Sequence, residues 1–110
     1  MKKFISILSL VCVLVISATS AQAAEEFTLT IKDHHFIPET LEIPAGEKVK
    51  IVILNQDSTP EEFESYELNR EKIIGGNSKG IVFVGPLDAG TYPFFGEFNM
   101  DTAKGQIIAK

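Results

Sequence analysis

Cysteine is nearly absent from this chain. Its 110 residues include one cysteine, Cys12, and two histidines, His34 and His35. Cys12 lies in an apolar N-terminal stretch that we expect to be removed, which leaves the rest of the chain without a disulfide, a thiolate metal ligand or a cysteine nucleophile. Small exported domains often depend on disulfides, so this one must depend on a well-packed core.

The N-terminal stretch has the features of a signal peptide. Lys2 and Lys3 precede an apolar run, and Ala21-Gln22-Ala23 is typical of a cleavage site. The run is shorter than the about 20 residues that a membrane-spanning helix needs. We therefore predict a cleaved signal peptide over residues 1–23 and an exported domain over residues 24–110 that is not anchored in the membrane.

The charge balance and the missing motifs exclude several classes of function. The formal net charge is −5, and loss of Lys2 and Lys3 with the signal peptide takes it to −7. Such a surface disfavours nucleic acids and anionic membranes as partners. Because the sequence also lacks a Ser-His-Asp grouping, a glycine-rich phosphate loop and an isolated pair of buried carboxylates, we predict no enzymatic activity.

Apolar and polar residues alternate along several short segments of the chain. The clearest are residues 27–31 and 49–53, and Gly/Pro turns such as Pro44-Ala45-Gly46-Glu47 separate the segments. Many short strands without a long helical pattern predict an all-β sandwich in one domain. Residues 66–74 are ambiguous, and we expect an irregular connection with a helical turn there.

The C-terminal part of the chain resembles the ligand-bearing hairpin of a cupredoxin. Its frame consists of Gly90-Thr91-Tyr92-Pro93-Phe94, then Gly105 and a closing strand over residues 106–109. Upstream, Ile43-Pro44-Ala45-Gly46 and the alternating segment that ends at Asn55 fit the same family. The resemblance implies a cupredoxin-like Greek-key β-sandwich of about seven short strands.

The same resemblance implies where copper ligands would lie. Gly96 occupies the cysteine position, Glu61 and Asn99 occupy the two histidine positions, and Ala103 occupies the methionine position. A type 1 copper site needs a soft thiolate, two imidazoles and a weak axial ligand. We therefore predict that this protein holds no type 1 copper.

A shorter match points to iron. Glu62-Phe63-Glu64-Ser65, followed by Leu68 and Glu71-Lys72, resembles the cupredoxin-like components of bacterial periplasmic ferrous-iron uptake systems. The resemblance implies a periplasmic protein that binds or hands on iron, with copper as the alternative ion. Its implied partners are a high-affinity iron permease and a second periplasmic metal-binding protein.

Hard donor residues gather in two loops that we expect to meet at one end of the sandwich. Oxygen donors suit iron and manganese better than copper(I), while a methionine would attract copper. Strand alternation places Glu62 and Glu64 on one face and Glu61 on the other, so the first two rank highest. The candidate metal ligands are Glu61, Glu62, Glu64, Glu97, Asn99, Met100, Asp101 and His35.

The two adjacent histidines point to opposite faces if they lie on a strand. At most one of them therefore faces the ligand segments, and sequence does not decide between His34 and His35, which could equally be exposed residues at a strand end. The glutamates have an alternative role as well, as a solvated acidic edge that keeps the sheet from pairing with other chains.

The aromatic residues divide by the same alternation. We expect Phe94, Tyr92 and Phe63 to pack in the core, while Phe95 and Phe98 form an apolar collar around the loops. Such a collar leaves two other functions open. One is a metal-free β-sandwich that binds another protein, and the other is a partner in ferrous-iron oxidation or electron transfer.

Overall fold

The computed structural model describes residues 23–110, and nearly all of the predicted signal peptide lies outside this range. The described residues form nine strands and one turn of 3-10 helix, η1. None of their helical segments is long and apolar enough to cross a membrane.

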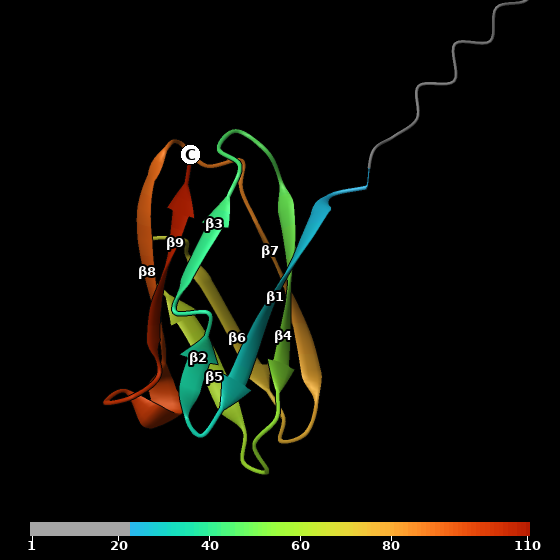
Figure 1. Cartoon of the computed structure of the whole chain (residues 1–110), viewed down its shortest axis with the longest axis vertical. Coiled ribbons are helices and arrows are strands. Elements are labelled where there is room, and N and C mark those ends of the chain that lie inside the picture. The colour runs from blue at the N-terminus through green and yellow to red at the C-terminus, as the bar shows by residue number, and fades with distance from the viewer. Residues whose placement is uncertain (1–22) are drawn as a thin grey trace, which may run out of the picture.

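Two sheets pack face to face and confirm the predicted all-β sandwich (Figure 1). One sheet has the strand order β2-β1-β4-β7, and the other has the order β3-β9-β8-β5-β6. The elements in chain order are β1 (Glu25–Lys32), β2 (His35–Ile37), β3 (Thr40–Ile43), β4 (Val49–Asn55), β5 (Glu61–Ser65), β6 (Arg70–Ile74), β7 (Lys79–Val84), β8 (Gly90–Gly96), η1 (Glu97–Asn99) and β9 (Lys104–Ala109).

Strand β6 corrects one prediction. Its residues Arg70–Ile74 pair antiparallel with β5, so that Glu61 lies opposite Ile74 and Ser65 lies opposite Arg70. The expected irregular connection over residues 66–74 is wrong for this half. Four of the five residues of β6 are exposed, because the strand forms the edge of its sheet and shows little of the alternation that marks a half-buried strand.

Three phenylalanines stack at the centre of the core. Phe94 from β8 meets Phe36 edge-on, with ring centroids 4.9 Å apart, and Phe63 from β5 at 5.1 Å. Phe94 is only 2% exposed, as the alternation predicts. Phe95 on the opposite face is half-buried, and 49% of Phe98 is exposed.

The end of the sandwich that carries η1 is tied together by polar contacts. The carboxylate of Asp57, just after β4, accepts hydrogen bonds from the backbone N–H groups of Asp33 and His34, at 2.8 and 3.0 Å. Both donors have positive φ angles and form the β1–β2 turn. The hydroxyl of Thr102 donates to the carbonyl of His34 at 2.7 Å. This turn is therefore held from two sides, beside the loop that follows η1.

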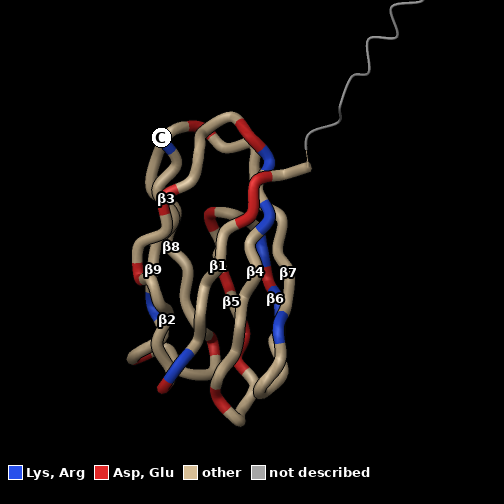
Figure 2. Tube along the Cα trace, turned by 45° about the vertical axis from the view of Figure 1, so that its right-hand side comes forward, with Lys and Arg blue, Asp and Glu red and all other residues tan. Residues whose placement is uncertain are grey.

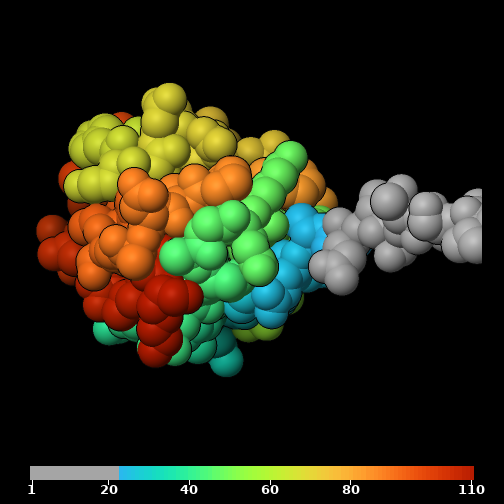
Figure 3. Space-filling view, turned by 90° about the horizontal axis from the view of Figure 1, so that it is seen from above, coloured from blue at the N-terminus to red at the C-terminus, as the bar shows by residue number. Residues whose placement is uncertain are grey.

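The opposite end of the sandwich is seen from above in Figure 3. There the β3–β4 turn meets the C-terminus and the β7–β8 connection. The N–H of Ala45 donates to the carbonyl of Lys110 at 3.2 Å, and that of Gly46 donates to the carbonyl of Leu87 at 2.8 Å. Gly46 has a φ of 76°, a conformation that favours glycine.

Candidate metal centre

Strand β5 carries carboxylates on both of its faces. Glu61 and Phe63 point into the sandwich, and Glu62 and Glu64 point outward, as the alternation predicts. These glutamates lie in a paired strand rather than in a loop. The register places Glu64 directly opposite Glu71 of β6.

Four outward carboxylates from three elements meet at this place. Glu62 and Glu64 come from β5, Glu71 from β6 and Glu97 from η1, and one carboxylate oxygen from each lies within 4.8 Å of all the others. Figure 2 shows acidic positions along β5 and toward the η1 end. We call these four residues the outer carboxylate cluster. Glu71 was not among the sequence candidates, because its contribution depends on the pairing of β6 with β5.

Among the residues that the structure describes, no basic side chain forms an ion pair with the outer carboxylate cluster. Within residues 23–110 the sole ion pair joins Lys110 to Glu42, with Nζ 2.9 Å from Oε1. The two basic residues of β6 are turned toward β7, where Arg70 Nε donates to the Phe83 carbonyl at 2.8 Å and Lys72 lies against Gly80. Carboxylates directly opposite each other on neighbouring strands destabilise a sheet.

Glu62 is the most enclosed member of the cluster. Only 5% of it is exposed, and neither its Oε1 nor Oε2 of Glu64 has a hydrogen-bond partner within residues 23–110. A hydrogen bond shared with Glu71, burial away from water and the charge of Glu97 raise the pKa of Glu62 to about 8. A carboxylate buried without a partner is costly, so this site favours a proton or a cation.

The arrangement fits a hard divalent cation. Two oxygens on opposite sides of one ion are about 4–5 Å apart when each is about 2.0–2.6 Å from it, the range for magnesium and calcium. The 4.8 Å limit within the cluster is compatible with that spacing. Because Glu71 and Glu97 are exposed while Glu62 is enclosed, such an ion would have a route to solvent on one side.

The inward glutamate, Glu61, has a different environment. It is 1% exposed, and its Oε1 accepts hydrogen bonds from the N–H groups of Phe98 at 2.9 Å and Glu62 at 3.1 Å. Its Oε2 accepts one from the side-chain amide of Asn99. Gly96 completes the site, since a Cβ there would lie 2.6 Å from Glu61 Cδ. The Glu61 carboxylate is therefore fully engaged within the protein.

The other sequence candidates line two surface depressions, one of which also includes Glu97 of the outer carboxylate cluster. Met100 and Asp101 line a shallow depression beside η1, together with His34. His35, the histidine in the predicted ligand set, lines a separate depression at β2. The β1–β2 turn explains this difference, because its left-handed backbone places His34 rather than His35 beside the loop after η1.

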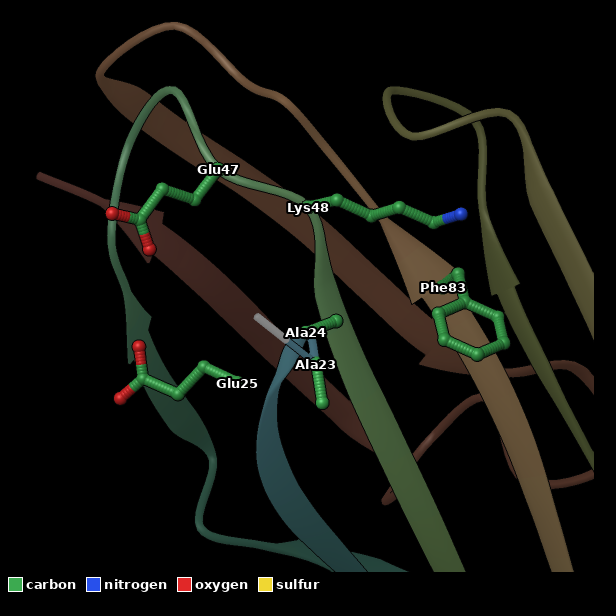
Figure 4. Close-up of a pocket in the computed structure, with 6 residues that line it drawn as sticks. All are labelled: Ala23, Ala24, Glu25, Glu47, Lys48 and Phe83. Atoms are coloured by element: carbon green, nitrogen blue, oxygen red, sulfur yellow. The ribbon is translucent and has the colours of Figure 1, made fainter. Parts of the chain in front are cut away.

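Another depression lies at the opposite end of the sandwich and is shown in Figure 4. There the ammonium group of Lys48 extends over the ring of Phe83, 5.0 Å from its centroid, and away from Glu47. The carboxylates of Glu25 and Glu47 are not part of a metal-binding group among the described residues. This depression therefore lacks the converging donors of the outer carboxylate cluster.

Comparison with known families identifies the family to which the fold belongs. A model of the cupredoxin-like domain matches residues 5–109. The chain belongs to the cupredoxin-like family. An uncharacterised protein of Rickettsia prowazekii is 46% identical over 83 residues, which are 76% of this chain and 66% of that protein.

Solved copper proteins share the architecture at low sequence identity. Auracyanin A, a blue copper protein of Chloroflexus aurantiacus, has a TM-score of 0.69 and 13% identity, over 80% of this chain and 100% of that one. Amicyanin of Paracoccus versutus has a TM-score of 0.62 and 15% identity, over 82% and 86%. The metal-binding domain of a Cu(I)-exporting P-type ATPase of Streptococcus pneumoniae has 0.62 and 16%, over 77% and 84%.

Proposed function

We propose that this protein is a periplasmic, non-enzymatic carrier of a divalent cation, with ferrous iron as its cargo. It would act in an iron-uptake system, beside a permease and a second metal-binding protein. The observation that carries the proposal is the outer carboxylate cluster. It brings four carboxylates together without a basic partner among the described residues, and its most enclosed members have unpartnered oxygens.

The donor set favours iron(II) or manganese(II) over copper. Carboxylate oxygens are hard ligands, whereas copper(I) prefers thiolates and thioethers. Met100, the one soft donor among the sequence candidates, is 54% exposed and follows η1. The half-open geometry also suits a carrier, because an ion held between enclosed and exposed carboxylates can be released to a partner.

Absence of type 1 copper is part of the proposal. The interior position where the cupredoxin resemblance expects copper holds the hydrogen-bonded pair of Glu61 and Asn99, packed against Gly96 and Ala103. These residues offer neither the thiolate nor the imidazoles of a blue site. In this proposal the cation site lies one residue further along β5, at Glu62, on the outer face of the sheet.

Calorimetric titration of residues 24–110, which contain every described strand, tests the proposal. We expect Fe(II), under anaerobic conditions, and Mn(II) to bind more tightly than about 1 mM, which corresponds to about −4 kcal/mol. Glu62→Gln and Glu64→Gln should each weaken binding about tenfold or more, about 1.4 kcal/mol, because glutamine keeps the shape and loses the charge. Neither change should lower the thermal stability of the metal-free protein.

Glu47→Gln is the matched control, since it removes the same charge from an exposed position at the far end of the sandwich. It should leave the affinity unchanged. A Cu(II) titration adds a colour test, in which an intense thiolate band near ~600 nm is expected to be absent. If the wild type binds neither Fe(II) nor Mn(II) more tightly than millimolar, the carrier proposal fails and a metal-free interaction module becomes the better account.

A further inference from the structure

Glu97 is the member of the outer carboxylate cluster that lies outside the strands. It begins η1, whereas the other three members lie on the paired strands β5 and β6. The residues on either side of it are both in contact with the Glu61 carboxylate. A Cβ on Gly96 would lie 2.6 Å from Glu61 Cδ, and the N–H of Phe98 donates to Glu61 Oε1 at 2.9 Å.

We propose that Glu61 is a positioning residue for cation binding. From inside the sandwich its carboxylate holds η1 against the end of β5, and this keeps Glu97 beside Glu62 on the outer face. The proposal rests on the cation-binding function proposed above. In this proposal Glu61 supports the cation site on the outer face without being a ligand of the cation.

Hydrogen bonds tie the loop around η1 to the Glu61 carboxylate and to itself. Asn99 donates its side-chain amide to Glu61 Oε2, and its own carbonyl accepts the N–H of Ala103 at 2.8 Å. The N–H of Gly96 donates to the carbonyl of Ala103, also at 2.8 Å. The loop therefore closes on itself around the carboxylate, and a displacement of Glu61 would move its ends together.

The hydrogen-bond partners of Glu61 explain why this position holds a glutamate. All three groups that contact its oxygens are N–H donors, from Glu62, Phe98 and Asn99. A carboxylate offers acceptors in every direction, whereas an apolar side chain would leave these donors unpaired in a buried site. An aspartate would keep the charge but lose the reach across the gap to η1.

The test measures Mn(II) affinity for two variants that loosen this contact from opposite sides. Glu61→Asp shortens the β5 arm, and Asn99→Ala removes a donor from the loop. Each should weaken Mn(II) binding about 10-fold to 100-fold, the usual effect of losing a group that orients a metal ligand. The same two changes made in a Glu97→Gln background should cause little further loss, because their effect passes through Glu97.

Ile43→Ala is the control for general destabilisation, since Ile43 is a core residue on β3, away from η1. It should lower thermal stability without changing Mn(II) affinity. If Glu61→Asp does not fold, Asn99→Ala and its Glu97→Gln double variant still decide the outcome. Wild-type affinity retained in Asn99→Ala, or an equal loss with and without Glu97, overturns the positioning role alone and leaves the carrier proposal intact.

NMR relaxation of the metal-free protein gives a readout that needs no cation. The amide of Glu97 should become more mobile in Asn99→Ala and Glu61→Asp, while the amides of β5 keep their wild-type order. An equally ordered Glu97 in both variants contradicts the inference. If the wild type binds no Mn(II) but the two variants still show a more mobile Glu97 amide, the proposed function is overturned and the role of Glu61 in placing Glu97 is kept.

Discussion

Glu61 and Glu62 are chain neighbours with the same side chain and nearly the same burial, at 1% and 5% exposed. On the inner face, both oxygens of Glu61 accept hydrogen bonds from N–H donors. On the outer face, Glu62 meets Glu64, Glu71 and Glu97, and its Oε1 has no hydrogen-bond partner in the described part of the chain. The fraction of a carboxylate that is buried therefore says little about its role here, and the identity of its neighbours says much more.

The two faces of β5 illustrate two ways to keep a carboxylate out of water. The inner carboxylate is paired with donors and contributes to the fold, because a satisfied buried acceptor costs little. The outer carboxylate is surrounded by others of its kind, an arrangement that is unfavourable until a proton or a cation joins it. Unfavourable arrangements of this sort are typical of functional sites.

The largest effect on stability is expected for Phe94, an apolar residue of β8 on the inner face of the sheet that contains β5. Phe94→Ala should lower the free energy of unfolding by about 3–5 kcal/mol, as is usual when a fully buried phenylalanine is truncated. Phe94 packs between Phe36 and Phe63 and has little room to relax. Chemical denaturation measures this value. A loss below about 1 kcal/mol would mean that Phe94 does not face the core and that the assigned register is off by one residue.

A smaller loss is expected for the polar residue of the same face. Glu61→Ala should lower the free energy of unfolding by about 2–3 kcal/mol, since it leaves N–H donors unpaired in a buried site. Glu62→Ala is its matched partner, because it removes the same group from the outer face and relieves repulsion. The comparison between the faces breaks down if chemical denaturation shows Glu62→Ala to be the more damaging change.

A pH dependence of stability is expected from the outer face. The folded protein raises the pKa of Glu62 from 4.5 to about 8, so the folded state holds this proton more tightly than the unfolded state. The resulting stabilisation is complete below the unfolded pKa and is lost as pH rises toward about 8. Thermal melts of the wild type should therefore show a decline over this range that Glu62→Gln lacks.

Mn(II) sharpens the same measurement. Added at about pH 8, it should restore the melting temperature of the wild type, because a cation that binds only the folded state stabilises it by mass action. It should do so far less for Glu62→Gln. If the melting temperature of Glu62→Gln declines with pH as much as that of the wild type, the pH dependence belongs to other groups and not to Glu62.

Much of the fold could be predicted from the sequence, because strand alternation and turn residues are local signals. The burial of Phe94 and the opposite directions of Glu61 and Glu62 followed from a period of two residues. Strand β6 could not be predicted in this way. It is an exposed edge strand, so its Arg70–Ile74 segment carries little hydrophobic alternation.

The candidate site was predictable only in part, for a related reason. Glu62 and Glu64 share a face by local geometry, but Glu71 joins them through the pairing of β6 with β5, which sequence did not reveal. His35 was placed in the ligand set, yet the left-handed β1–β2 turn brings His34 to the loop instead. Pairing partners and turn handedness are set by contacts between distant segments.

The sequence by itself determined that this chain is an all-β sandwich and that its acidic residues on β5 alternate between two faces. The tertiary structure decided the role of the carboxylates on each face. It surrounded Glu61 with N–H donors from the η1 loop, and it brought Glu71 and Glu97 beside Glu62. The physical reason is that a carboxylate takes its role from the charges and donors around it, and here these come from segments distant in the chain.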